Sequence, residues 1–271
     1  MGRLDGKVAV VVGAAGDANM GQVIARRFAA EGARVVVAGR HEAPLAALAA
    51  ELGGCAALCD ITRKGDLDAL VATARATYGH VDIAVNCTGW GLLAKLLETT
   101  EQQLDQVTAL QFKGTFFFLQ AFVGAMAADR GGSVILMSSA SVYAVLHHHA
   151  AYIGTKAGAD ALMRCFANEF GAKGVRVNSI APGLTATPMT AREVAMPGLE
   201  AAFVKEYPLG RVGTTTDIAD AALWLAGDEC FMTGQVLQVN GGLTLRRNPT
   251  PREIHAAIQA ASAAGAAEGP R

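Results

Sequence analysis

The sequence has little charge, and neither sign is in excess. Charged residues make up 17% of the 271 residues, and 23 basic residues nearly balance 24 acidic ones. A net charge of −1 gives no basic surface for nucleic acid or for an anionic membrane. Hydrophobic residues reach 52%, which is too many for a disordered chain and enough for a large core. We therefore expect a globular protein with a small-molecule partner, no nucleic acid and no membrane.

Long apolar runs are also missing. The runs at residues 8–12 and 35–38 have the length of strands and end at glycine. Residues 1–7 include Asp5 and no apolar signal segment, so we expect a cytoplasmic protein. The five scattered cysteines predict no disulfide framework. Cys55 and Cys59 have no second pair with which to form a zinc site, so we expect no metal.

Short apolar segments alternate with amphipathic ones through most of the chain. Strands are expected at 7–12, 34–38, 56–59, 81–86, 132–138, 176–180 and 236–239, and helices at 20–31, 44–52, 65–78, 100–128, 151–171 and 216–226. This order predicts an α/β fold: a single-domain, doubly wound parallel sheet (a Rossmann fold) of about seven strands. Because the strands are apolar without alternation, we expect helices to bury both faces of the sheet.

A glycine-bearing turn follows the first expected strand. Gly13 ends the strand, a helix begins near Met20, and Gly21 lies in its first turn. Such a turn presents backbone N–H groups and a helix dipole to a pyrophosphate, so it predicts a dinucleotide site. The turn is two residues longer than the usual fingerprint. Asn19 is expected to cap the helix, and Asp17 to face solvent.

The end of the second strand bears on the choice of nucleotide. Arg40 stands where a carboxylate often binds the adenosine ribose of NAD. Its planar guanidinium suits a 2′-phosphate, which favours NADP(H). Glu42 is near enough to bind a ribose hydroxyl instead, so NAD(H) stays open.

Three residues suggest the chemistry. Tyr152 and Lys156 are four residues apart on an expected helix and share one face. A nearby ammonium favours the phenolate, so it should lower the pKa of Tyr152 and allow proton exchange with a carbonyl or alcohol oxygen. Ser139, at the end of the fifth strand, can hold the same oxygen.

Together these features resemble the short-chain dehydrogenase/reductase family over roughly residues 7–245. The motifs that carry the resemblance are the 13–21 loop, Asp60, Asn86-Cys87-Thr88-Gly89, Ser138-Ser139, Tyr152-x-x-x-Lys156, Pro182-Gly183 with Thr187, Pro208-Leu209-Gly210-Arg211, Thr233-Gly234 and Asn240-Gly241-Gly242. The resemblance implies an oxidoreductase that moves a hydride between nicotinamide and a ketone or secondary alcohol carbon. It also implies a homo-oligomer, often a tetramer.

Further site residues follow from the resemblance. It implies adenine binding by Asp60 and Ile61, and Lys156 on the nicotinamide ribose. The remaining cofactor contacts that it implies, beyond Gly13, Asn19, Met20, Gly21 and Arg40, are Asn86, Thr88, Gly89, Pro182, Gly183, Leu184 and Thr187. A substrate lid is implied at about 188–208, within a catalytic domain of residues 1–245.

The chain departs from the family pattern in three ways, of which one, Cys87 and Thr88 in place of an Asn-Ala pair, is interpreted as a change in packing. Gln111 stands where the family has an asparagine of the proton relay through the lysine, and we keep it among the catalytic candidates. The long glycine loop is similar to that of enoyl reductases of the same family. Those enzymes place the lysine seven residues after the tyrosine, where this chain has Ala159. Carbonyl chemistry is therefore favoured, and enoyl reduction and a non-catalytic dinucleotide-binding sensor stay as alternatives.

The roles of two segments near the expected substrate mouth are left undecided by the sequence. Tyr143, His147 and His149 are candidate substrate contacts. Residues 246–271 form a C-terminal extension in which Thr250, Pro251 and Glu253 make a helix start. That extension is interpreted either as a short helix, ended by Gly265, that docks over the substrate cleft or on a neighbouring subunit, or as a flexible tail.

Overall fold

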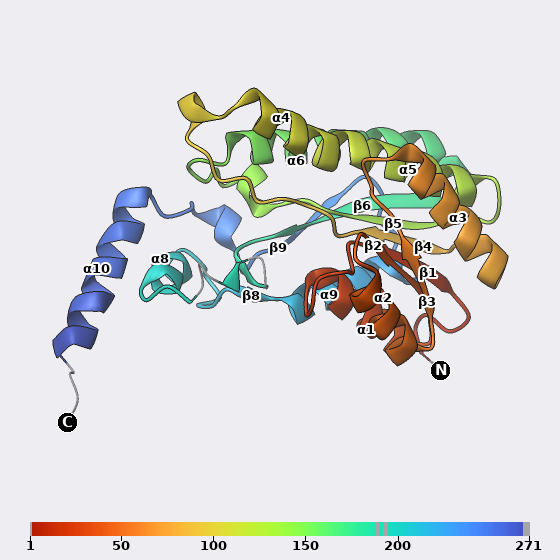
Figure 1. Ribbon diagram of the computed structural model, residues 1–271, viewed down its shortest axis with the longest axis horizontal. Helices are drawn as coiled ribbons and strands as arrows, with labels where there is room; N and C mark the ends of the chain where they lie inside the picture. The colour runs from red at the N-terminus through yellow and green to blue at the C-terminus, as the bar shows by residue number, and fades with distance from the viewer. Residues whose placement is uncertain (1, 188–189, 192–194, 268–271) are drawn as a thin grey trace.

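The valine-rich and alanine-rich segments form one seven-stranded parallel sheet in a computed structural model that describes residues 2–187, 190–191 and 195–267 (Figure 1). The strand order is β3-β2-β1-β4-β5-β6-β9. The bounds are β1 Val8–Val12, β2 Arg34–Gly39, β3 Cys55–Leu58, β4 Ile83–Asn86, β5 Gly132–Met137, β6 Val175–Pro182 and β9 Val236–Val239. A separate parallel pair joins β7 (Thr185–Ala186) to β8 (Gly213–Thr214).

Helices cover both faces of this sheet (Figure 1). One layer holds α1 (Met20–Ala30), α2 (Glu42–Leu52) and α9 (Thr215–Ala226), and its side chains form one apolar core with the sheet. The other layer holds α3 (Lys64–Tyr78), α4 (Glu101–Thr108), α5 (Gly114–Ala127) and α6 (Ala150–Phe170), over a second core. Short 3₁₀ turns lie at η1 Leu96–Glu98, η3 Ala140–Val142, η4 Gly171–Lys173 and η5 Leu243–Leu245. The expected doubly wound fold is confirmed.

The edge strands differ from the expectation of strands buried on both faces. In β3 the burial alternates between half-buried and exposed residues, and in β9 no residue is fully buried. Each of these strands has a neighbour on one side only and lies near the rim of the helix layers. Continuous burial holds for β1 and β4 in the middle of the sheet.

The expected single helix over 100–128 is wrong in one detail. A π-helical turn, η2 (Ala109–Lys113), separates α4 from α5. The extra residue arises where Gln111 is buried and holds contacts outside its own helix, which helical periodicity does not reveal.

The strand order places the carboxyl ends of β1 and β4 side by side. The chain crosses from β1 toward β2 on one side and returns to β4 on the other, so a crevice opens between these two ends. The loops after β1, β4, β5 and β6 all begin at this edge, and it is the expected place for a dinucleotide.

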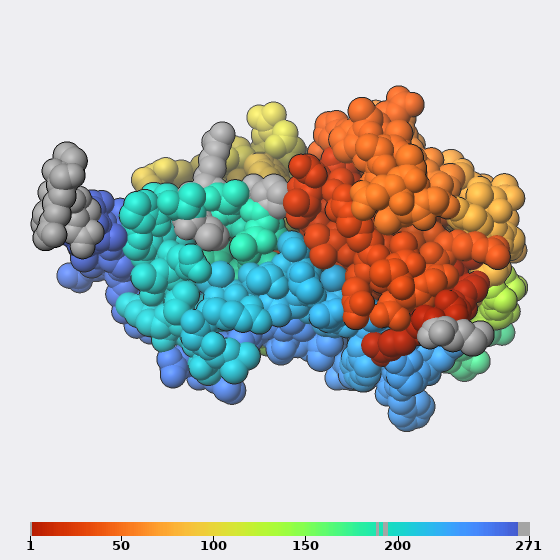
Figure 2. Space-filling view, turned by 90° about the horizontal axis from the view of Figure 1, so that it is seen from below, coloured from red at the N-terminus to blue at the C-terminus, as the bar shows by residue number. Residues whose placement is uncertain are grey.

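A second group of elements lies at the far end of this edge. α8 (Leu199–Val204) and α10 (Pro251–Ala267) pack against each other, away from the N-terminus (Figures 1 and 2). Gly265 does not end α10, which continues to Ala267. Residues 188–189 and 192–194 of the expected lid, and 268–271 of the extension, lie outside the described residues. Within the described ranges no helix is long and apolar enough to cross a membrane.

Candidate active site

The glycine turn after β1 is shaped for close approach of another backbone. Gly13 has φ +92°, and a Cβ there would come 2.9 Å from the backbone carbon of Cys87. A Cβ on Gly21 would come 2.7 Å from the Gly13 oxygen. A side chain at Gly13 would therefore clash with the loop after β4, and one at Gly21 with the turn itself, so both glycines allow the tight strand-to-helix turn whose N–H groups can face a pyrophosphate. The turn fits the dinucleotide that the sequence predicts.

Asn19 holds the longer part of this turn in place. Its Oδ1 accepts from Gln22 N at 2.9 Å and so caps α1, as the sequence predicts. Its Nδ2 donates to Gly13 O at 2.8 Å. Asp17 is exposed, as expected. Because both ends of the Asn19 amide are engaged within the turn, this side chain acts by fixing the loop that would face the phosphates.

The nucleotide end of the crevice contains an exposed cation. Arg40 follows β2 directly and is exposed. Burial raises the pKa of the nearby Asp60 carboxyl, but hydrogen bonds from Thr62 and the charge of Arg40 outweigh it, so this pKa lies below its ordinary value. Ile61 is only 2% exposed and packs against Gly114, which leaves little of it to contact a base.

The three chemical residues meet in one pocket of about 260 Å³ at the carboxyl edge of the sheet. Ser139 follows β5, and its Oγ lies 2.8 Å from Ser141 Oγ. Tyr152 and Lys156 lie on α6, with Lys156 Nζ 5.9 Å from the centre of the phenol ring. Lys156 Nζ also donates to the Met137 oxygen at 2.6 Å. The arrangement brings a hydroxyl, a phenol and an ammonium to the same space.

Burial dominates the proton affinities in this pocket. It raises the pKa of the Tyr152 phenol above its ordinary value, and interaction with Ser139 opposes the rise. Burial also lowers the pKa of Lys156 to about 8, while the Asp160 carboxylate favours the charged ammonium. The predicted lowering of the phenol pKa by Lys156 is therefore not observed, because loss of water around the phenolate has the larger effect.

Gln111 connects two walls of the site. Its Oε1 accepts from Trp90 N at 2.9 Å, and its Nε2 donates to Thr155 Oγ1 at 2.7 Å. A Cβ on Gly89 would lie 3.6 Å from both Gln111 Oε1 and Lys156 Nζ. Gln111 thus ties the loop after β4 to the helix that carries the phenol, and this connection accounts for the π-helical turn.

The loops after β4 and β6 complete the pocket. Thr88 and Gly89 line it, and Asn86 supports them by accepting from Thr88 N at 2.9 Å. Further predicted residues that line the same pocket are Met20, Pro182, Gly183, Leu184, Thr187 and His149. Tyr143 and His147 lie elsewhere: Tyr143 is half exposed, and His147 borders a separate apolar hollow beside η1.

Several lining residues escaped the sequence analysis. They are Trp90, Met137, Ser141, Leu146, Leu243 and Asn248. Trp90 directly follows the motif at 86–89, and Ser141 lies two residues after Ser139, so both positions could have been inferred. Asn248 comes from a segment far along the chain, and no local pattern singles it out. Phe203 also lines the pocket and belongs to the segment expected as the lid.

The described residues contain no cluster of three or more histidine, cysteine or acidic side chains that could hold a metal ion. The chemistry of the donor groups in the pocket is instead that of proton exchange and hydrogen bonding to an oxygen atom.

Comparison with known proteins agrees with this geometry. A family model described as Enoyl-(Acyl carrier protein) reductase matches residues 13–244. D-threitol dehydrogenase of Mycolicibacterium smegmatis is 35% identical over 250 residues, which cover 90% of this chain and 95% of that protein. Galactitol 2-dehydrogenase (L-tagatose-forming) of Cereibacter sphaeroides is 37% identical over 249 residues, 90% and 97% of the two chains. A short-chain type dehydrogenase/reductase from Mycobacterium ulcerans has a similar structure, with TM-score 0.87, 30% identity and coverage of 94% and 98%.

Proposed function

The chain belongs to the short-chain dehydrogenase/reductase family, and on that premise we propose which of its residues perform the reaction. The protein is an NAD(P)-dependent oxidoreductase that transfers a hydride between nicotinamide and the carbon of an alcohol or carbonyl group. The observation that carries the proposal is that Ser139, Tyr152 and Lys156 line one pocket at the carboxyl edge of the sheet.

Tyr152 is the proton carrier of this proposal. In alcohol oxidation its phenolate oxygen accepts the hydroxyl proton of the substrate, and in ketone reduction its phenol donates that proton back. Burial raises the pKa of the phenol, so the protonated form needed for reduction is the stable one near neutral pH. The Ser139 hydroxyl donates a hydrogen bond to the same substrate oxygen and holds it beside the phenol.

Lys156 has two tasks in this scheme. Its ammonium stabilises the phenolate across the 5.9 Å between Nζ and the ring centre. The bond to Met137 O fixes the position of Nζ, and its remaining hydrogens are available to a ribose hydroxyl. Gln111 acts through the helix, because it positions Thr155 one residue before Lys156.

A bound nicotinamide nucleotide supplies or takes up the hydride. The turn from Gly13 to Gly21 would hold its pyrophosphate, with Asn19 and Met20 at the start of α1. Pro182, Gly183 and Leu184 would orient the nicotinamide, because they follow β6 and line the pocket beside Tyr152.

NADP(H) is the preferred nucleotide in this proposal. Its support is the exposed Arg40 at the end of β2: among the described residues its guanidinium takes part in no ion pair and no hydrogen bond, and it can receive a 2′-phosphate. Glu42 begins α2 two residues later and is the residue that would favour NAD(H).

Carbonyl reduction and alcohol oxidation take precedence over enoyl reduction. The observation in favour of enoyl chemistry is the description of the matching family model. The lysine in the pocket is nevertheless Lys156, one helical turn after the phenol, and position 159 is a buried alanine. Turnover of secondary alcohols with no turnover of an enoyl thioester is the expected outcome.

The replacement Tyr152→Phe tests the proposal. It removes only the hydroxyl, so we expect turnover to fall by about 10²–10⁴-fold while nucleotide binding, followed by fluorescence titration, stays within a few-fold. Tyr78→Phe, at the end of α3 and outside the pocket, is the matched control and should retain full activity. Full activity in the Tyr152→Phe protein would reject the mechanism.

The oligomeric state and the cellular location are also part of the proposed function. We propose a homo-oligomer, in the family manner a tetramer, supported by exposed apolar side chains on the π turn, on α5 and before β9, namely Phe112, Phe116 and Phe231. A cytoplasmic location is supported by the five free thiols, as in a reducing compartment. Sedimentation equilibrium tests the first point and microscopy of a fluorescent fusion the second.

A further inference from the structure

The segment after η5 leaves the sheet and crosses the outer end of the pocket. The strap, residues 246–250, follows η5 and leads directly into α10. It lies beyond residues 13–244 that the family model matches. The strap is therefore a part of this chain whose role the family resemblance leaves open.

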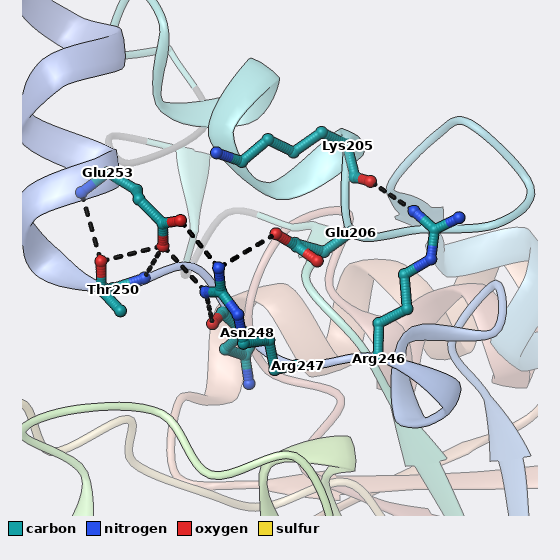
Figure 3. A network of polar contacts seen from close by, with 7 residues as sticks. All are labelled: Lys205, Glu206, Arg246, Arg247, Asn248, Thr250 and Glu253. Carbon is teal, nitrogen blue, oxygen red and sulfur yellow. Dashed lines mark hydrogen bonds and ion pairs between the residues drawn. The ribbon is translucent and has the colours of Figure 1, made fainter.

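Ionic and backbone contacts fix the strap at both ends (Figure 3). Arg247 donates two hydrogen bonds to the Glu253 carboxylate, at 2.8 and 2.7 Å. The same carboxylate accepts from Thr250 N at 2.7 Å, and Thr250 Oγ1 accepts from Glu253 N at 3.3 Å, which caps α10. Arg246 donates to Lys205 O at 2.7 Å, beside α8. The strap has a defined path between the sheet and α8.

The helix that follows adds a second anchor. A Cβ on Gly198 would come 2.3 Å from Ala257 O, so the start of α8 touches the backbone of α10 directly. Ile254 packs on a small apolar cluster that contains Phe203 and Leu243. Since Phe203 and Leu243 also line the pocket, α10 supports one wall of the substrate space.

Asn248 is the strap residue that reaches the pocket. It is only 8% exposed, and it lines the pocket that contains Ser139 and Tyr152. Its Nδ2 donates to Ala144 O, in the loop before α6. Among the residues that the structure describes, none donates a hydrogen bond to its Oδ1. The protein thus orients the Asn248 amide through Nδ2 and leaves Oδ1 available to accept a hydrogen bond.

Asn248 Oδ1 is not fully enclosed: it keeps some accessible surface and can therefore be reached by a molecule in the pocket. The nearby wall consists of Leu146, Leu184, Phe203 and Leu243. A ligand that displaces water from this oxygen must supply a hydrogen-bond donor in its place, or the oxygen loses a hydrogen bond. A substrate hydroxyl at this place would supply the missing hydrogen.

The charged residues that line the pocket also indicate the charge of the ligand. Of the described lining residues, Lys156 is the only lysine or arginine; its Nζ donates to Met137 O, and the Asp160 carboxylate favours its charged form. No arginine and no carboxylate of the described chain lines the pocket. The wall therefore suits an uncharged substrate.

We propose that Asn248 is a specificity-determining residue that accepts a hydrogen bond from a second hydroxyl of an uncharged alcohol substrate, at a distance from the carbon that reacts. The inference rests on the proposed function, since it takes the pocket of Tyr152 as the substrate site. Arg247 and Glu253 are positioning residues that hold Asn248 in place.

The test compares two alcohol series on three proteins. The substrates are the secondary diols of butane, pentane and hexane, whose hydroxyls stand progressively further apart, and the matching secondary mono-alcohols. The proteins are wild type, Asn248→Leu and the control Gln259→Leu, which makes the same exchange at an exposed position of α10. kcat and KM are measured with both nucleotides, and the thermal shift caused by each diol is measured on the same samples.

We expect wild type to prefer at least one diol over its mono-alcohol by about tenfold or more in kcat/KM. Asn248→Leu should abolish this preference through KM, with mono-alcohol turnover retained, and Gln259→Leu should behave as wild type. A diol preference that survives in Asn248→Leu, or an equal loss for both alcohol series, would overturn the inference, as would a wild type that prefers no diol.

Failure of the proposed function has a different signature. If no alcohol is turned over, or if Tyr152→Phe is fully active, the mechanism is rejected. The thermal shift then still decides the role of Asn248: a diol that stabilises wild type and not Asn248→Leu supports it, and equal shifts in the two proteins contradict it.

Discussion

Two regions of the molecule are held together by different forces. We call β1, β2, β4 and their helix layers the nucleotide half, and the pocket side formed by Leu146, Leu184, Phe203, Leu243 and the strap the substrate wall. In the nucleotide half, β1, β2 and β4 lie between two helix layers, and nearly all of their side chains are buried hydrocarbon. Among the described residues, the substrate wall has a cluster of five buried apolar side chains, and hydrogen bonds and ion pairs of the strap hold it in position. The first region is stabilised by the area that it removes from water. The contacts of the second region fix its geometry at the surface and contribute little free energy of unfolding.

This difference has a functional meaning. In the proposed function, the turn that every nucleotide needs belongs to the region with the large apolar core. The residue proposed to select a substrate, Asn248, belongs to the region with the small one. Substitutions in the first region should change kcat/KM for all substrates by the same factor. Substitutions in the second region should change kcat/KM by factors that differ between substrates.

The largest expected effect separates the two regions by stability. Phe122, fully buried 4.7 Å from the ring of Phe118, should cost about 3–5 kcal/mol of unfolding free energy when replaced by alanine. Phe203→Ala should cost roughly 1–3 kcal/mol, because water can enter from the pocket that Phe203 lines. Urea unfolding of both variants measures the difference, and equal losses would show that the wall is packed as firmly as the core.

The second effect concerns pH. Alcohol oxidation needs the deprotonated phenol of Tyr152, and burial raises its pKa above the ordinary value. Below that pKa the deprotonated fraction grows about tenfold per pH unit, so kcat/KM for oxidation should rise with pH through neutrality. The rise should flatten above about pH 8, where Lys156 loses the ammonium charge that stabilises the phenolate. Reduction needs the protonated form and should show no such rise. A slope that differs between substrates would mean that a group in the wall, rather than Tyr152, controls it.

The third effect belongs to the nucleotide half alone. Arg40→Ala should raise KM for NADPH by about tenfold and leave KM for NADH nearly unchanged, because only the 2′-phosphate loses a partner. The substrate preference at saturating nucleotide should stay the same. Parallel initial-rate measurements decide the point, and a wild type that prefers NADH would refute the proposed nucleotide.

The smallest effect is expected in the strap. Glu253→Gln removes the exposed ion pair with Arg247 but keeps a side chain that can cap α10. The melting temperature should not change measurably, since exposed pairs contribute little. KM for a preferred diol should rise about two- to threefold as Asn248 loosens, without a change in KM for the mono-alcohol. A clear drop in melting temperature would show that the ion pair between Arg247 and Glu253 contributes more to the free energy of unfolding than we infer.

Features of this protein that depend on local patterns could be predicted from the sequence, and features that depend on distant contacts could not. The strands, the Gly13 turn and the pair Tyr152 and Lys156 follow from local patterns: apolar runs, glycine after a strand, and a spacing of one helical turn. The π turn at Gln111 and the place of Asn248 in the pocket depend on partners 44 and 104 residues away. No local periodicity records such contacts. The pKa of Tyr152 also required the structure, because burial outweighs the charge that the sequence displays.

The contact between Gly198 and Ala257 has a consequence for how this protein can diverge. The two segments meet through main-chain atoms, and Gly198 has φ +83° with no room for a Cβ. Mutation can therefore alter the side chains of α10 widely without separating the two helices, while position 198 tolerates glycine alone. Gene variants with altered substrate range should accumulate changes in the last helix and strap and preserve this one small residue.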